Sequence, residues 1–169
     1  MPELGFECHL GEVIYTYRPN EISFYHIHKL GCAWQECSFE EMPTPWTKLL
    51  VQHPDHEVLV KAQAWFKREY EGVYEAIFSN RKLLEVTVHG ANKGGAVLRV
   101  AEMLGVKREH IYCVGDNQND IPMLAVSAQG FAPANCAKAV RDWGATVVCD
   151  CEDGAIADVI EILDKRYQE

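Results

Sequence analysis

The chain has 169 residues, of which 48% are hydrophobic, so it can bury one sizeable core or two small ones. Lysine and arginine total 16 against 25 acidic residues, and a net charge of −9 argues against a nucleic-acid partner, because no basic excess is present to neutralise phosphates. No apolar run approaches the roughly 18 residues of a membrane span, so we expect no membrane partner. The seven cysteines include no Cys-x-x-Cys pair, which is typical of a reduced cytoplasmic protein.

The first half of the chain shows a mixed pattern of short strands and one helix. Apolar and polar residues alternate in the first two of three segments predicted as strands, which are rich in β-branched and aromatic side chains, and the third follows Pro43 and Pro45. These segments are 8–17, 22–30 and 46–52. Arg18 to Glu21 is predicted as a turn, and apolar residues at helical spacing predict a helix over 55–72 that ends at Gly72. Residues 1–88 are therefore predicted to form an α+β lobe.

From residue 84 onward, predicted strands alternate with predicted helices. Strands are expected at 84–88, 111–114, 130–132 and 146–149, and helices at 92–104, 119–126, 135–143 and from 153 onward. Asn135 and Asp153 stand where two of these helices would be capped. Alternation of this kind implies a parallel sheet, whose buried strands read as continuous apolar runs. Residues 89–169 are therefore predicted to form an α/β unit.

A polar cluster follows the apolar strand at 111–114. Residues 115–120 read Gly-Asp-Asn-Gln-Asn-Asp, which places carboxylates and carboxamides at the carboxyl end of that strand. In open α/β sheets ligands bind at these ends, and Mg²⁺ prefers oxygen ligands. Lys93-Gly94 opens the preceding helix, where helix amides favour an anion. Together the two motifs indicate a magnesium and phosphate site.

Each motif also has an ordinary structural explanation when it is taken alone. A lysine before a helix is usually solvated, and an Asp-rich turn after a strand is often only a helix cap. His26 and His28 would face one side of a predicted strand and could suit a metal, although packed or solvent-facing histidines are far more common. Cys149 and Cys151 could bind a soft metal, but unpaired cysteines are usually small core residues.

Five segments of the second half carry a family resemblance when they are taken in order. They are Asn92 to Ala96, Leu104 to Val106, Val114 to Leu124, Asn135 to Val140, and Glu152 to Ile156. From Leu84 onward the chain resembles the haloacid dehalogenase (HAD) superfamily, and within it the Cof-type phosphatases. The first ninety residues resemble, more loosely, the later part of a Cof-type cap, the lobe that covers the active site. The resemblance implies an α/β fold with part of a HAD-like Rossmannoid core, a parallel sheet and an α+β cap portion.

The resemblance also implies roles for individual residues. Lys93 would hold the transferring phosphoryl group, which makes it both catalytic and substrate-binding, and Asn119 would bind substrate beside it. Asp116 would bind Mg²⁺, and Asp120 would assist catalysis by supporting Lys93 or the waters of the metal. Asn135 would either lie near the site or cap its own helix. The parent reaction would be Mg²⁺-dependent hydrolysis of a small phosphorylated metabolite, such as a sugar phosphate.

One part of the family's catalytic machinery is absent from these 169 residues. HAD phosphatases attack phosphorus with the first aspartate of an Asp-x-Asp motif, and no aspartate here is followed by another two residues later. We therefore expect the chain to be inactive alone. Without the nucleophile strand, segment 111–114 would have an open edge, so we expect a homodimer or a partner chain there. A non-catalytic phosphate-binding or partner-binding scaffold and a truncated gene product remain alternatives.

Overall fold

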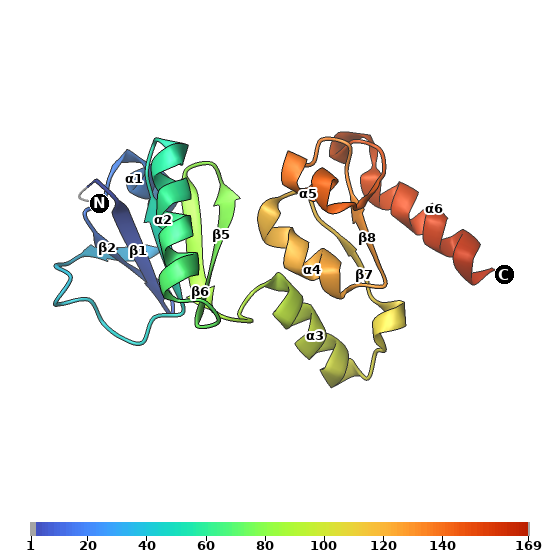
Figure 1. The fold of residues 1–169 in the computed structure, drawn as a ribbon, viewed down its shortest axis with the longest axis horizontal. Coiled ribbons are helices and arrows are strands. Elements are labelled where there is room, and N and C mark those ends of the chain that lie inside the picture. Colours follow the sequence, from blue (N-terminus) through green and yellow to red (C-terminus); the bar gives the residue numbers. More distant parts are fainter. Residues whose placement is uncertain (1–2, 169) are drawn as a thin grey trace. The chain divides into compact units, whose positions relative to one another are not determined.

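The computed structural model describes residues 3–168, and the chain divides into two compact units, Met1–His89 (unit 1) and Gly90–Glu169 (unit 2) (Figure 1). Unit 1 contains β1 (Gly5–Leu10), β2 (Val13–Tyr17), α1 (Glu21–Leu30), β3 (Ala33–Glu36), β4 (Lys48–Gln52), α2 (His56–Glu69), β5 (Tyr74–Asn80) and β6 (Leu83–Val88). Unit 2 contains α3 (Lys93–Leu104), η1 (Arg108–His110), β7 (Tyr112–Val114), η2 (Gln118–Asp120), α4 (Ile121–Val126), β8 (Gln129–Ala132), α5 (Lys138–Trp143), β9 (Thr146–Val147), η3 (Cys151–Asp153) and α6 (Ala155–Tyr167), where η marks a 3-10 turn. None of the helices that the structure describes is both long enough and apolar enough to cross a bilayer.

Unit 1 is a six-stranded sheet that carries a helix on each face. The strand order is β3-β2-β1-β4-β6-β5, and neighbours are antiparallel except for β2 and β3. Because side chains alternate between faces, Cys8 and its partner Leu49 lie on the opposite face from Glu7 and its partner Leu50. Helix α2 packs on the Cys8 face through the fully buried Leu59. Helix α1 covers the Glu7 face.

The prediction of a strand at 22–30 is wrong, because this segment forms helix α1. The side chain of Asn20 accepts hydrogen bonds from the backbone N–H groups of Ile22 (2.9 Å) and Ser23 (3.3 Å), and Ser23 Oγ accepts one from Asn20 N (3.1 Å). This capping box satisfies N–H groups that a helix start leaves free, and Gly31 ends the helix at φ 64°. The caps therefore outweigh the strand-like composition of the segment.

Other boundaries in unit 1 also differ from the predictions. Segment 8–17 is a hairpin that turns at Gly11, and the strands β3 and β5 were not predicted. The helix over 55–72 and the strand over 46–52 correspond to α2 and β4 within a few residues.

A buried polar network joins α1 to the sheet. The carboxylate of Glu7, which is fully buried, accepts hydrogen bonds from His26 Nδ1 (2.8 Å) and from Gln52 Nε2, and Gln52 Oε1 accepts one from Ser23 Oγ. Burial raises the pKa of Glu7, but hydrogen bonds from His26 and Gln52, together with the nearby ring of His9, whose Nε2 lies 3.7 Å from the carboxylate, outweigh it and hold the pKa at about 2. Glu7 is therefore a buried, ionised and partnered carboxylate in the sheet centre.

Unit 2 is a parallel sheet of order β7-β8-β9 with helices packed around it, so the predicted parallel α/β fold is confirmed. Leu124 and Val140 pack against the strands together with Cys113 and Ala132. Strand β7 forms one end of this sheet, and among residues 3–168 it pairs with β8 alone.

Two predicted helix caps in unit 2 are wrong. Helix α5 begins at Lys138, three residues beyond Asn135, whose Nδ2 instead donates to Cys151 Sγ (3.0 Å). Helix α6 begins after Gly154, and the nearby cap belongs to Asp150, which accepts from Glu152 N (3.1 Å) at the start of η3. The acidic residues here stabilise a short 3-10 turn rather than the helix itself.

Replacing Glu7 by glutamine is expected to lower the free energy of unfolding of the chain by about 2 kcal/mol at pH 7, because an amide presents a donor to the donors of His26 and Gln52. In the wild type the folded pKa of about 2 lies below the ordinary value of 4.5. The contribution of Glu7 is thus complete above pH 4.5 and is lost as the pH falls from 4.5 towards 2. Urea unfolding at several pH values measures both effects. Glu12→Gln, in the exposed hairpin turn, is the control; an E7Q variant that behaves like it would contradict the assignment.

Candidate active site

The amino end of helix α3 places Lys93 at the edge of unit 2. Asn92 caps the helix by accepting a hydrogen bond from Gly95 N (2.9 Å), so Lys93 is the first helical residue. A Cβ atom at Gly94 would lie 2.3 Å from the carbonyl oxygen of Pro122, which no real contact allows. The absence of a side chain at Gly94 therefore lets α3 approach the start of α4 closely.

The turn after β7 folds back on itself around Asp120. Asp120 Oδ2 accepts hydrogen bonds from the backbone N–H groups of Asp116 (2.9 Å) and Asn117 (3.1 Å). A Cβ atom at Gly115 would lie 2.4 Å from Asp120 Cβ, so glycine is required for this return. The carboxylate of Asp120 thus fixes the main chain of the polar cluster that ends β7.

The other oxygen of the same carboxylate contacts Lys93. Lys93 Nζ donates a hydrogen bond to Asp120 Oδ1, and the two side chains are 51% and 5% exposed. Burial raises the pKa of Asp120, but hydrogen bonds from Lys93 and from the N–H groups of Asn117 and Asp116 outweigh it and lower the pKa below its ordinary value. The Lys93 ammonium is therefore exposed to solvent, while the Asp120 carboxylate that holds it is buried and ionised.

The remaining predicted site residues lie in the same turn. The carbonyl oxygen of Asp116 accepts a hydrogen bond from Ala137 N (2.7 Å), which ties the turn to the chain before α5, and the residue itself is exposed. Asn119 is half-buried in η2, next to Asp120. The structure therefore brings Lys93 into contact with Asp120 and places Asp116 and Asn119 within the turn that Asp120 organises. Asn135 is exposed and neither caps α5 nor contacts this pair.

Sequence reasoning missed how the turn is held. Asp120 is bound by main-chain amides, with Asn117 capping η2 in a reciprocal capping box with Asp120. The signal was present, because an asparagine followed three residues later by an acidic residue is a variant of the capping-box pattern.

The described residues do not by themselves form a complete magnesium site. No group of three or more histidine, cysteine, aspartate or glutamate side chains among residues 3–168 is arranged to hold a metal ion. The carboxylate of Asp120 is already engaged, which leaves Asp116 as the exposed carboxylate of the turn. One carboxylate fits part of the oxygen shell that Mg²⁺ takes, which can be completed by water, phosphate or further protein oxygens.

The histidines and cysteines considered as metal ligands have other surroundings. His26 and His28 lie on helix α1 and not on a strand, so the alternation that put them on one side does not apply. His26 bonds to Glu7, and His28 Nδ1 lies 2.6 Å from the carbonyl oxygen of Phe24. The Asp158 carboxylate lies beside the Cys149 thiol and raises the pKa of that thiol to about 11, which disfavours a thiolate ligand.

A sequence profile of the haloacid dehalogenase-like hydrolases matches residues 6–160. The chain belongs to this family. The family resemblance seen in the sequence is thereby confirmed. The match runs through both units and includes Lys93 and the turn at 115–120.

Two phosphatases are similar in sequence to this chain, one over most of its length and one over about half of it. The chain is 28% identical to an HMP-PP phosphatase of Serratia proteamaculans over 145 residues. These residues cover 85% of this chain and 53% of that protein. A phosphoglycolate phosphatase of Halorubrum lacusprofundi is 32% identical over 79 residues, which cover 47% of this chain and 35% of that one. The chain thus spans about half, or less, of the length of these relatives.

Solved structures of the family share the fold. A subclass IIB sugar phosphatase of the HAD superfamily matches with a TM-score of 0.82 at 18% identity, over 96% of this chain and 62% of that one. A HAD-like hydrolase of Bacillus subtilis matches with a TM-score of 0.80 at 19% identity, over 95% and 65%. At such identities the likeness establishes the fold, and it confirms the predicted HAD-like α/β architecture.

Replacing Gly94 by alanine is expected to destabilise the chain by about 2 kcal/mol, because the added Cβ collides with the Pro122 carbonyl. Helix propensity alone predicts the opposite sign, since alanine is favoured over glycine by about 1 kcal/mol within a helix. Urea unfolding of G94A measures the effect. Ala96→Gly, at an exposed position of the same helix, reports propensity alone and should cost about 1 kcal/mol. A stabilised G94A variant would show that α3 and α4 do not approach as closely as the structure indicates.

Proposed function

We propose that the chain carries the cap-like lobe (residues 1–88) and the second half of the core (residues 89–169) of a Mg²⁺-dependent phosphatase. Its substrate would be a small phosphomonoester, such as a sugar phosphate. The observation that carries this proposal is the Lys93–Asp120 pair at the carboxyl end of β7, in a chain that belongs to the HAD-like hydrolases. The names of the relatives, which include phosphatases of small phosphorylated compounds, support it.

Lys93 would bind the phosphoryl group. An ammonium has three N–H donors, and Asp120 takes one of them, so two can be donated to phosphoryl oxygens without breaking the pair. The position of Lys93 at the start of the 12-residue helix α3 adds the favourable field of the helix dipole. Asp120 would act through Lys93, as a residue that positions the ammonium.

Asp116 and Asn119 would complete the part of the site that this chain supplies. The exposed carboxylate of Asp116 would be a ligand of Mg²⁺, which, when bound, neutralises charge on the phosphoryl oxygens. The side-chain amide of Asn119 would donate a hydrogen bond to the substrate phosphate. Asp120 holds the main chain of this turn, so the two side chains would start from a fixed backbone.

The chain alone would lack turnover. Transfer of a phosphoryl group to the protein requires a nucleophile, and the Asp-x-Asp spacing of the family does not occur in these 169 residues. Lys93 can stabilise charge on a phosphate but cannot replace the attacking carboxylate.

A second candidate function is a non-catalytic protein that binds a phosphate compound or a partner. It is favoured by the presence of the Lys93–Asp120 pair in a chain without the nucleophile motif. Calorimetric titration of the chain with phosphate and Mg²⁺ distinguishes the two functions. Phosphate binding without turnover that is lost in Lys93→Met favours the binding protein. No binding at millimolar phosphate favours the phosphatase, whose site would then need residues that this chain does not supply.

Strand β7 would form an interface in either case. Its outer edge is unpaired among the described residues, and open edges of this kind associate with other strands. We propose that this edge pairs with a second copy of the chain or with a separate partner chain. A cytoplasmic location is part of the proposal as well, supported by the seven cysteines, which are all free thiols.

The hydrolysis of p-nitrophenyl phosphate with Mg²⁺ tests the proposed inactivity. We expect the purified chain to release nitrophenol no faster than its Asp116→Ala variant, because neither contains the nucleophile. Measuring both proteins from parallel purifications controls for contaminating phosphatases. Turnover in the wild type that D116A abolishes would contradict the proposal.

Size-exclusion chromatography with light scattering tests the β7 edge. We expect the wild type to run as a dimer, and Val114→Lys to shift it towards the monomer, because a charge on the edge strand opposes pairing. Val73→Lys, at an exposed position between α2 and β5, is the control and should leave the dimer intact. A wild type that is monomeric with one cooperative melting transition would argue against this interface.

A further inference from the structure

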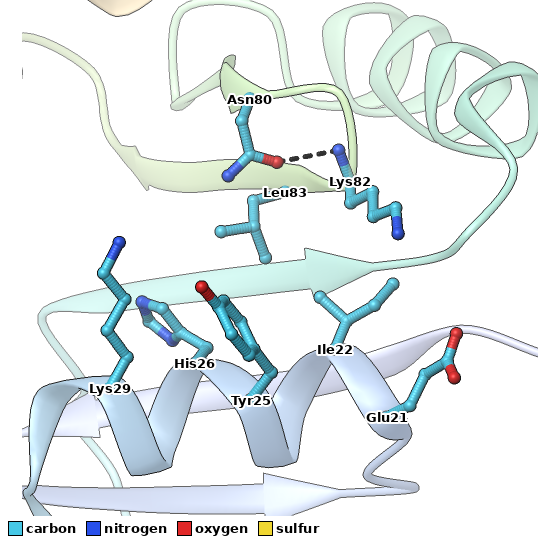
Figure 2. A pocket seen from close by; sticks show the side chains of 8 residues that line it. All are labelled: Glu21, Ile22, Tyr25, His26, Lys29, Asn80, Lys82 and Leu83. Carbon is cyan, nitrogen blue, oxygen red and sulfur yellow. Dashed lines mark hydrogen bonds between the residues drawn. The ribbon is translucent and has the colours of Figure 1, made fainter.

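A pocket in unit 1 lies between helix α1 and the turn that joins β5 to β6, and its volume is about 430 Å³. Helix α1 contributes Tyr25, His26 and Lys29, and the turn side contributes Asn80 and Lys82 (Figure 2). Figure 2 shows Tyr25 and Lys29 pointing from the helix towards the strands, and the side chain of Asn80 pointing towards the helix. We call this the α1–turn pocket.

The floor of the α1–turn pocket is apolar. Ile22 and Leu83 line it and are buried, at 8% and 9% exposure. The other lining residues are polar or charged, so the pocket combines apolar surface with hydrogen-bonding groups, as small-molecule sites do.

The helix wall of the pocket is held from below by the polar network of the sheet. Ser23 bonds to Gln52, and His26 Nδ1 lies 2.8 Å from the carboxylate of Glu7. Because an ionised carboxylate can only accept, Nδ1 is the donor, and Nε2 of His26 is left for other partners. The imidazole is therefore fixed in tautomer and in orientation.

The opposite wall is fixed by local hydrogen bonds. Asn80 Oδ1 accepts from the backbone N–H of Lys82 (2.8 Å), and the ring of His56 contacts the carbonyl oxygen of Arg81 (2.8 Å) from helix α2. The backbone of this wall is therefore held before any ligand arrives, and the ordering cost of binding falls on the lysine side chains.

The charges around the pocket favour an anion. Lys29 and Lys82 line it, and neither ammonium forms an ion pair with another residue of the described chain. The opposing charge in the lining is Glu21, and the carboxylate of Glu7 lies behind His26 and is already bonded. In a protein of net charge −9, two unpaired lysines at one hollow are a local exception.

We propose that the α1–turn pocket binds a small organic anion, with its phosphate or carboxylate group at one of the two lysines, Lys29 or Lys82, and its apolar part on Ile22 and Leu83. Tyr25, Asn80 and His26 offer further hydrogen-bonding groups in the same pocket. This site consists entirely of residues of unit 1, so it does not depend on Lys93 or on the proposed phosphatase function.

Amide chemical shifts of the ¹⁵N-labelled full chain test the proposal. Phenyl phosphate, benzoate and inorganic phosphate are titrated to about 10 mM, and the first two are expected to shift the amides of residues 22–29 and 80–83. Inorganic phosphate is expected to bind several-fold more weakly than phenyl phosphate, because it cannot use the apolar floor. The ratio between phenyl phosphate and benzoate identifies the preferred oxyanion.

Two matched double variants decide the role of the lysines. Lys29→Met/Lys82→Met is expected to bind phenyl phosphate at least about tenfold more weakly, whereas Lys61→Met/Lys67→Met, which removes the same charge from exposed positions of α2, should bind like the wild type. Shifts at the pocket should persist in Lys93→Met. Equal binding by the two double variants, no shifts at residues 22–29 and 80–83, or shifts confined to residues around Lys93 would overturn the proposal.

Discussion

The carboxylate of Asp120 is the contact on which the candidate site of this HAD-like hydrolase depends. One of its oxygens accepts the backbone N–H groups of Asp116 and Asn117, and the other accepts Lys93. A carboxylate that is almost fully buried would be costly to leave without partners, so the three donors explain how it can remain ionised. The arrangement joins a helix start and a strand end that lie 27 residues apart in the chain.

Unit 1 also contains a buried, ionised carboxylate that is held by hydrogen-bond donors, but its structural role differs. Glu7 is ionised and fully buried, and its partners Gln52 and His26 come from β4 and α1. In unit 2 the carboxylate supports a cation that solvent can reach, whereas in unit 1 it anchors a helix to a sheet. The same local chemistry therefore holds a solvent-exposed cation in unit 2 and a structural contact in unit 1, according to how exposed the partner is.

Strong local signals in the sequence led to correct predictions, and conflicting ones did not. Helices α3 and α5 end at Leu104 and Trp143, as their predicted ranges 92–104 and 135–143 required, because a left-handed glycine follows each, and the apolar run before Gly115 formed β7. Segment 22–30 failed because its β-branched and aromatic residues also suit the apolar side of a short helix, and Asn20 with Ser23 decided between the two. The edge strand β3 was missed because its residues are exposed and show no alternation of burial.

The candidate site shows a similar division. The family motifs placed Lys93 and the polar turn, and the spacing of Asn117 and Asp120 carried a capping-box signal, but that signal does not show that the same carboxylate also accepts from Asp116 N and from Lys93. Nor could the sequence reveal the α1–turn pocket, because Lys29 and Lys82 are 53 residues apart in the chain and come to line one pocket only through the order of strands in the sheet.

The location of the site within one unit has a practical consequence. The hydrogen bonds that join Lys93 to Asp120 and that cap the start of α3 with Asn92 are made within unit 2. Protonation of Glu7 at low pH would weaken the hydrogen bonds by which its carboxylate anchors α1 to the sheet. The anchoring of α1 and the support of the Lys93 ammonium therefore depend on separate sets of contacts.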